Sequence, residues 1–206
     1  GFTASAGSFV TRMASSMANG KPQTVHDVIP VISLDAASPG ASGTVSGSSN
    51  AIVAVYDVLA SGDPSVNLTI KSLVLTRGGN IGTRVATTAQ PKVYDYTSGS
   101  LGALLGTGGD WSGTTAGSTS TVTLDAPFTI TSGQTAKIAV TVNTASAAAN
   151  DTFQVYVDNT SALAGLFGGM SWYYTAVSPS PGTEPTNASP STLANTYPIY
   201  GHTQKY

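Results

Sequence analysis

Groups that could move protons or hold a nucleophile are scarce in this 206-residue chain. His26 and His202 are the only histidines, and each lies near a chain end. Glu184 is the only glutamate, and its setting, PGTEPTN, holds no second carboxylate. Cysteine is absent, which excludes thiol chemistry, disulfides and zinc–thiolate sites. Because acid–base catalysis needs such groups in combination, we predict no catalytic residue, no cofactor and no enzymatic activity.

Aspartates are the remaining candidates for a metal site, since Ca²⁺ prefers carboxylate oxygens. Asp57 and Asp63 flank one expected turn, and Asp151 and Asp158 flank one expected strand. Either pair could contribute ligands, but the D-x-D-x-D-G pattern of a calcium loop is absent. We expect these carboxylates to cap turns, and we predict no metal site.

Two glycine-rich stretches, GGN at 78–80 and GTGGD at 106–110, lack the lysine of a phosphate-binding loop and do not link a strand to a helix. We interpret both as turns. A nucleic-acid surface would also cluster its basic residues, whereas here they are scattered and the formal net charge is −2. We predict no nucleic-acid partner; the basic residues are Arg12, Lys21, Lys71, Arg77, Arg84, Lys92, Lys137 and Lys205.

Aromatic side chains allow two interpretations. Trp111, Trp172, Tyr173 and Tyr174 could form a platform on which sugars stack. Tyr173 and Tyr174 are adjacent, however, and in a strand they would point to opposite faces, so they cannot share one flat platform. We favour core and interface packing, with Phe167, Trp172, Tyr173 and Tyr174 as candidate interface aromatics.

Four N-x-S/T sequences, at Asn67, Asn150, Asn159 and Asn187, are candidate glycosylation sites. A chain so rich in Asn, Ser and Thr contains several by chance, and Pro190 directly follows the last one. Glycans would be attached only if the source organism N-glycosylates its exported proteins.

The composition indicates a folded, exported β-protein. Charged residues make up only 9% of the chain, and Ser and Thr together make up about a quarter. Val, Ile and Thr occur in short runs, unlike in disordered chains. No apolar run approaches the 18 residues of a membrane span. The chain begins at Gly1 rather than Met, and we expect a signal peptide to have been removed.

Short strands separated by turn signals recur about every ten residues from residue 24 onward. Pro30, within the apolar run 25–34, predicts an edge strand or an interruption. The apolar phase changes within 66–77, so we predict a bulge near Lys71–Ser72. A Gly-rich loop is expected at 99–117, and a strand split at 126–127. The predicted core is Ile52, Ala54, Tyr56, Leu68, Ile70, Ile138, Val140, Val142, Phe153 and Val155.

We therefore predict an all-β fold in which residues 24–206 form one antiparallel sandwich of seven to nine strands, with a Pro/Ser/Thr-rich loop at 176–196. The stretch ASGTVSGSSNAIVAVYDVLASGDPSVNLTIKSLVLTRGG, followed by KVYDY and PFTITSGQTAKIAVTVN, resembles immunoglobulin-like domains of prokaryotic surface-layer and pilus-like appendage proteins. The match covers residues 35–157. It implies an immunoglobulin-like fold and an extracellular, cell-surface location. The long N-terminal helix of type IV pilins and the cysteine pair of chaperone–usher pilins are missing.

Residues 1–23 form a separate N-terminal arm. Phe9, Met13 and Met17 have helical spacing, whereas residues 2–10 alternate as in a weak strand. We expect the arm to dock on the neighbouring subunit as a donated strand, with its larger apolar side chains filling pockets. These side chains are Phe2, Phe9, Val10, Met13 and Met17. The alternative is that the arm folds back on its own sandwich as a short helix.

The expected function is a structural subunit of an extracellular, pilus-like filament that assembles with itself as a homopolymer. The first alternative is a surface adhesin or carbohydrate-binding module. The second is a viral coat or tail subunit. All three are consistent with a β-rich chain without cysteine or clustered catalytic groups.

Overall fold

The computed structural model describes residues 28–40, 45–64, 66–157, 170–176 and 198–206, with the backbone alone for 126–127 and 170–176. This part of the chain is all-β, as predicted, and its only helical piece is the short 3-10 turn Gly82–Arg84. The arm of residues 1–23 and nearly all of the loop 176–196 lie outside the described residues.

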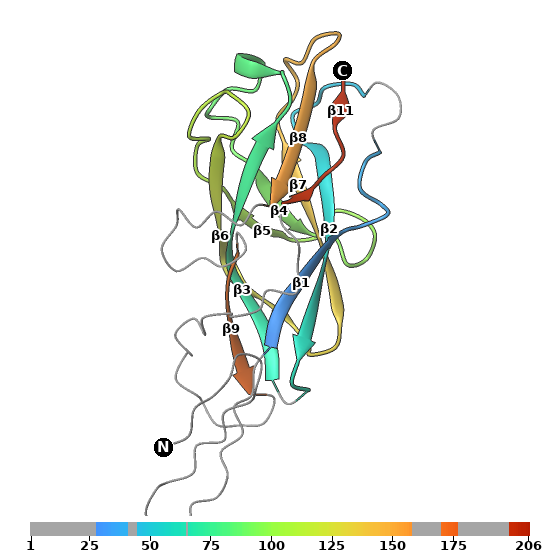
Figure 1. Ribbon diagram of the computed structural model, residues 1–206, viewed down its shortest axis with the longest axis vertical. Helices are drawn as coiled ribbons and strands as arrows, with labels where there is room; N and C mark the ends of the chain where they lie inside the picture. The colour runs from blue at the N-terminus through green and yellow to red at the C-terminus, as the bar shows by residue number, and fades with distance from the viewer. Residues whose placement is uncertain (1–27, 41–44, 65, 158–169, 177–197) are drawn as a thin grey trace, which may run out of the picture.

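Two antiparallel sheets pack face to face as a sandwich (Figure 1). The first sheet has five strands in the order β1-β2-β7-β4-β5. Their bounds are β1 Val28–Leu34, β2 Ala51–Gly62, β4 Lys92–Asp95, β5 Leu104–Thr107 and β7 Thr135–Val142.

The second sheet has six strands built around β3, with the order β10-β8-β3-β6. Two further strands join it, because β11 pairs with β8 and β9 pairs with β3. Their bounds are β3 Val66–Gly78, β6 Thr119–Ile130, β8 Thr152–Val157, β9 Met170–Ala176, β10 Ile199–Tyr200 and β11 Gln204–Lys205.

The described chain thus has eleven strands, more than the seven to nine predicted. One cause is β5, which lies inside the Gly-rich stretch that we expected to be a loop. Another is the C-terminal stretch 197–206, which forms two short strands, β10 and β11, rather than one. Strands this short carry too few residues to show an alternating pattern in sequence.

The core lies between the sheets, and nine of the ten predicted core residues are buried in it. Ile52 is the exception and is only half-buried. The pairing of β2 with β7 shifts between Ile52 and Ala54, and Val53 is fully buried there. The bulge changes the alternation by one residue, which the apolar run AIVAV does not reveal.

The predicted bulge in β3 is confirmed. The pairing of β3 with β6 shifts between Ile70 and Ser72, and Leu68, Ile70, Leu73 and Leu75 are all buried. The expected split of the opposite strand at 126–127 is wrong, since β6 runs without a break. The register nevertheless jumps there by several residues, so the interruption is a bulge within one strand.

Pro30 lies on an edge strand, as predicted. In the described chain β1 pairs only with β2, and Pro30 is opposite Ala60. Ala60 directs both its N–H and its C=O toward residues 133–134, next to β7. Pro30 and Ala60 are therefore a non-hydrogen-bonded pair, and the position without an N–H faces the open edge.

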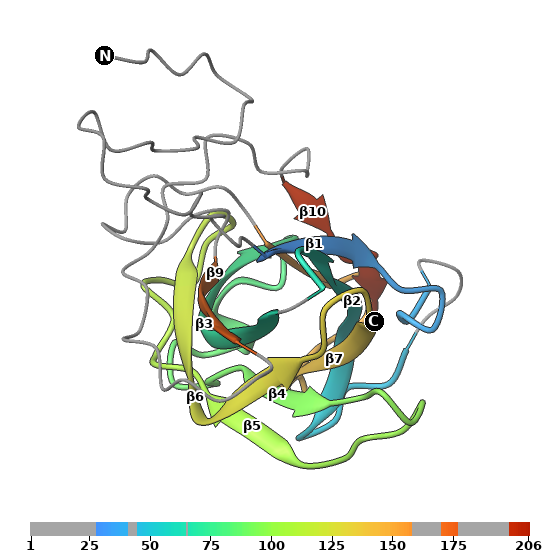
Figure 2. The same ribbon diagram turned by 90° about the horizontal axis from the view of Figure 1, so that it is seen from below.

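The opposite side of the sandwich is closed (Figure 2). The stretch GTGGD forms the junction, because Gly108 makes a β-bridge to Val122 of β6 and the Gly109 N–H donates to Thr121 O at 3.0 Å. A Cβ on Gly106 would lie 2.3 Å from the carbonyl oxygen of Thr123, so only glycine fits this approach. The prediction of a simple turn missed this contact between the sheets.

Candidate functional site

The residues best suited to acid–base chemistry are not gathered in the described structure. His202 is exposed after β10, and His26 and Glu184 lie outside the described residues. Within the described ranges, no three His, Asp or Glu side chains are close enough together to hold a metal ion. We therefore looked for charged pairs, aromatic surfaces, hollows and strand edges.

Asp151 caps a turn, as expected. Its Oδ2 accepts the Ala148 N–H at 2.7 Å, and its Oδ1 forms an ion pair with Arg84. The hydrogen bond from Ala148, followed by the one from Arg84, lowers the pKa of this carboxyl. Asp158, which we considered as a second calcium ligand, lies outside the described residues.

Asp57 belongs to a charged cluster with Asp35 and Lys137, which the sequence did not predict. Strand pairing brings them together, because Asp57 is opposite Lys137 on β7 and Ser33 on β1. The Lys137 ammonium lies 2.6 Å from Asp35 Oδ2, and the other oxygen of Asp35 accepts the Ala37 N–H at 2.6 Å. The cluster fastens the turn after edge strand β1 to the middle of the first sheet.

The two carboxyls of this cluster have opposite electrostatic environments. The hydrogen bond from Lys137 lowers the pKa of Asp35, whose carboxyl is buried. Burial, together with the neighbouring Asp35 charge, raises the pKa of Asp57. Oδ1 of Asp57 is buried and makes no hydrogen bond. Asp57 is thus the strained member of the cluster, and this arrangement is a structural latch without a nearby hollow for a substrate.

Arg77 is the largest fully buried side chain in the described structure. Its guanidinium donates to the carbonyls of Val85 and Gly82, each at 3.0 Å. It also lies 5.7 Å from the ring centre of Trp111 and 5.5 Å from that of Phe153. Burial lowers the pKa of Arg77. The arginine of the motif SLVLTRGG is therefore a structural clamp that holds the segment 82–85 against the core.

Trp111 is not available for sugar stacking. Only 2% of it is exposed, it packs edge to face against Phe153, and its Nε1 donates to Ala89 O at 2.8 Å. The core role that we favoured is confirmed for this residue. Trp172, Tyr173 and Tyr174 occupy consecutive positions of β9, while Phe167 lies outside the described residues. Their role at an interface stays a prediction.

The candidate glycosylation sites differ in access. Asn67 lies in β3 between neighbouring strands, and its Oδ1 is buried without a hydrogen bond. Asn150 is exposed in the turn before β8 and has a positive φ of 72°. Asn159 and Asn187 lie outside the described residues. Of the two described asparagines, Asn150 is the one that a glycan could reach.

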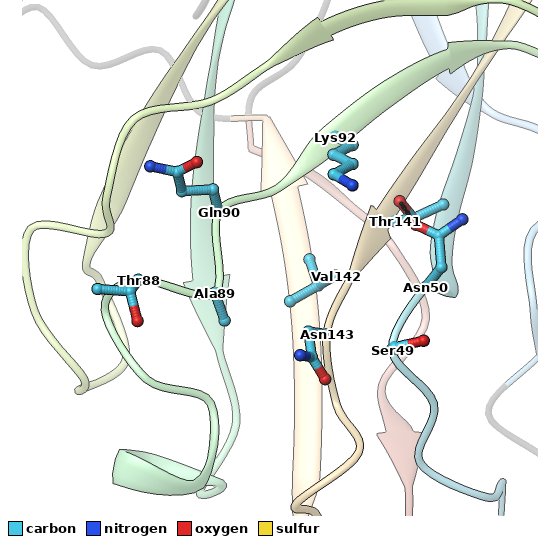
Figure 3. A pocket seen from close by; sticks show the side chains of 9 residues that line it. All are labelled: Ser49, Asn50, Thr88, Ala89, Gln90, Lys92, Thr141, Val142 and Asn143. Carbon is cyan, nitrogen blue, oxygen red and sulfur yellow. Dashed lines mark hydrogen bonds between the residues drawn. The ribbon is translucent and has the colours of Figure 1, made fainter.

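A shallow polar hollow opens beside the first sheet (Figure 3). It has a volume of about 200 Å³ and is lined by three separate segments, which contribute Asn50, Gln90, Lys92 and Asn143 among others. A second hollow of about 150 Å³ shares Asn143 with the first. Side-chain amides and hydroxyls make this a surface that can form hydrogen bonds. Sequence reasoning missed it because its segments are far apart in the chain and follow no spacing pattern.

The strand edges are the remaining candidates for a functional surface. In the first sheet β5 reaches the closed side, so β1 is its open edge. In the second sheet β9 pairs with β3, and the described chain places no strand on its other side. No protein-family model matches the chain, and no curated protein or solved structure matches it either. No helix of the described residues is long and apolar enough to cross a membrane.

Proposed function

We propose that this chain is a structural subunit of an extracellular, cell-surface filament, and that the arm of residues 1–23 connects each subunit to the next. The observation that carries the proposal is the position of β1, because the strand into which the arm leads is the open edge of its sheet. The arm thus joins the sandwich at its periphery, from where it can extend to a neighbour.

The strand order supports an immunoglobulin-like fold. Such domains place strands A-B-E-D in one sheet and C-F-G in the other. The orders β1-β2-β7-β4 and β3-β8-β10 correspond to these two sets, and β5 and β6 are additions between D and E. This agreement supports the resemblance to prokaryotic surface-layer and pilus-like proteins, and with it the extracellular location.

Donation of an arm from each subunit to the next is a head-to-tail contact, which propagates into an open filament rather than closing as a dimer. Backbone hydrogen bonds provide the affinity in such strand addition, and side chains at alternating positions provide the specificity. Phe2, Phe9, Val10, Met13 and Met17 are the apolar side chains that the arm offers for this purpose.

The test is a variant that lacks residues 1–22, examined beside the full chain by negative-stain electron microscopy and light scattering. We expect the full chain to form filaments and the truncated chain to be a folded monomer with an unchanged circular dichroism spectrum. Filaments of the truncated chain would contradict the proposal and would make the aromatic segment 162–175 the better candidate for the connector.

A further inference from the structure

We infer that the acceptor for the arm is the free side of β9, where residues 2–10 of a second copy of this chain add as a strand. This inference rests on the proposed function and specifies its docking surface. The strand pairing of the second sheet is its starting point.

Strands β8 and β9 lie on the same flank of β3 and run in the same direction. β8 pairs with Leu75–Gly78, and β9 pairs with the part of β3 from Val66 to Leu73. Val157 at the end of β8 is opposite Leu75, and Met170 at the start of β9 is opposite Leu73. The two strands are therefore successive halves of one line beside β3, interrupted by residues 158–169.

Only the β8 half of this line has a described strand on its outer side. There β10 pairs with Val157 and Tyr156, and β11 pairs with Phe153 and Thr152. β10 begins opposite the last residue of β8, so the described strand stops where the β9 half begins. Beside β9, in line with β10, the described structure thus leaves a strand position of about seven residues without an occupant.

The sequence favours the arm as the occupant of this position. Residues 1–21 contain no proline, so every residue of the arm after the first turn of chain can donate a backbone hydrogen bond. The alternation over residues 2–10 matches the length of β9. The rival segment of the same chain, 177–197, carries Pro179, Pro181, Pro185 and Pro190.

The other open edge is a poorer acceptor. Pro30 removes a donor on the side of β1 that faces away from β2, and a proline at such a position discourages strand addition. β9, with the sequence MSWYYTA, contains no proline and is rich in residues that favour strands. The second sheet therefore offers the more complete row of backbone groups.

Cysteine cross-linking tests this inference, because the chain has no cysteine of its own. One set of variants carries the donor cysteine, as Ser5→Cys or Ala6→Cys, so that both faces of the arm are sampled. The second set carries the acceptor cysteine in β9, as Ser171→Cys or Thr175→Cys. Ser33→Cys, an exposed position of β1, is the matched control acceptor. Directly opposed strand residues have the Cα spacing that a disulfide needs.

Donor and acceptor variants are mixed during assembly, oxidised, and analysed by non-reducing electrophoresis and peptide mass spectrometry, while the same samples are imaged. We expect at least one donor–β9 heterodimer, formed at least tenfold more efficiently than any donor–Ser33→Cys heterodimer. Filaments without a β9 cross-link, or with cross-links mainly to Ser33→Cys, would overturn the inference but leave the proposed function standing. Donor and acceptor cysteines placed in one chain provide a further check, since a disulfide within diluted monomers would show that the arm folds back on its own β9. Mixtures that form no filaments would contradict both proposals.

Discussion

The ammonium of Lys137 on β7 lies 2.6 Å from Oδ2 of Asp35, the residue that directly follows edge strand β1. This contact crosses β2, because Asp57 of β2 is opposite Lys137. The hydrogen bond with Asp35 raises the pKa of Lys137 and lowers that of Asp35, so both groups are held in their charged forms. The end of the open edge strand is thereby tied to the centre of its sheet.

Asp57 is expected to destabilise the folded chain at neutral pH. Burial and the Asp35 charge raise its pKa above the ordinary 3.8, so the folded state binds this proton more tightly than the unfolded state. The contribution of Asp57 to stability is therefore present below pH 3.8 and lost as the pH rises through the raised pKa. We predict that Asp57→Asn increases the free energy of unfolding at pH 7 by about 0.5–1 kcal/mol, a small value because the side chain is partly exposed.

Urea unfolding at pH 7 and at pH 3 measures this effect, and the gain should shrink at the lower pH. Asp35→Asn is the matched control with the opposite sign. Its lowered pKa means that Asp35 stabilises the fold above pH 3.8 and less so as the pH falls through the folded-state pKa. We expect this substitution to cost about 1–2 kcal/mol at pH 7. Equal effects of both substitutions would show that the two carboxyls do not have opposite environments.

Replacing Arg77 should destabilise the sandwich strongly. In Arg77→Met the carbonyls of Val85 and Gly82 lose their buried donor, and the two aromatic rings lose the guanidinium between them. We predict a loss of about 3 kcal/mol or more in the free energy of unfolding, measured by urea titration. Arg77→Lys keeps the charge but has no planar fork to reach both carbonyls, so an intermediate loss is expected. A cost below about 1 kcal/mol for Arg77→Met would rule out the clamp.

Gly79 should be irreplaceable, unlike a nearby glycine. Its φ is +93°, and an added Cβ would lie 2.2 Å from the carbonyl oxygen of Thr152. We predict that Gly79→Ala costs more than about 2 kcal/mol because the backbone must move at the junction of β3 with β8. Gly109→Ala is the matched control, since an added Cβ there has no heavy atom within 4 Å. Thermal unfolding followed by circular dichroism distinguishes the two, and similar melting temperatures for both variants would contradict this account.

The elements that the sequence predicted well are those in which side-chain alternation and backbone geometry coincide. In β3 the change of apolar phase between Ile70 and Leu73 revealed the bulge, and in β1 the proline revealed the edge. The bulge at Ile52–Ala54 could not be seen, because a run that is apolar at every position has no phase to shift. The bridge of Gly108 to Val122 was missed because it depends on the close approach of two backbones, which leaves no side-chain pattern.

The same limit applies to the charged cluster and the polar hollow. Asp35, Asp57 and Lys137 are distant in sequence and meet only through the pairing of three strands. Asn50, Lys92 and Asn143 likewise come from three separate segments. Sequence spacing predicts a site only when one element supplies most of its residues, and neither group of residues meets that condition. By contrast, the turn-capping role of Asp151 was predictable because its backbone partner is Ala148, three residues away.

Pro30 provides a test of how the open edge of β1 is protected. Its partner Ala60 directs its backbone groups toward the neighbourhood of β7, so a residue with an N–H at position 30 would direct that donor away from β2. Pro30→Val should therefore preserve the hydrogen bonds within the sheet, and its free energy of unfolding should stay within about 1 kcal/mol of the parent value. The new donor completes the outer row of β1, and a complete edge invites pairing between sheets. We predict that Pro30→Val, made in the variant lacking residues 1–22, converts a monomer into a species that associates through its edges. Light scattering at increasing protein concentration measures this association, and Ile29→Val, which leaves the row of donors unchanged, is the control. If Pro30→Val instead loses more than about 2 kcal/mol and remains monomeric, then position 30 serves the packing of β1 in the core and has no protective role at the edge.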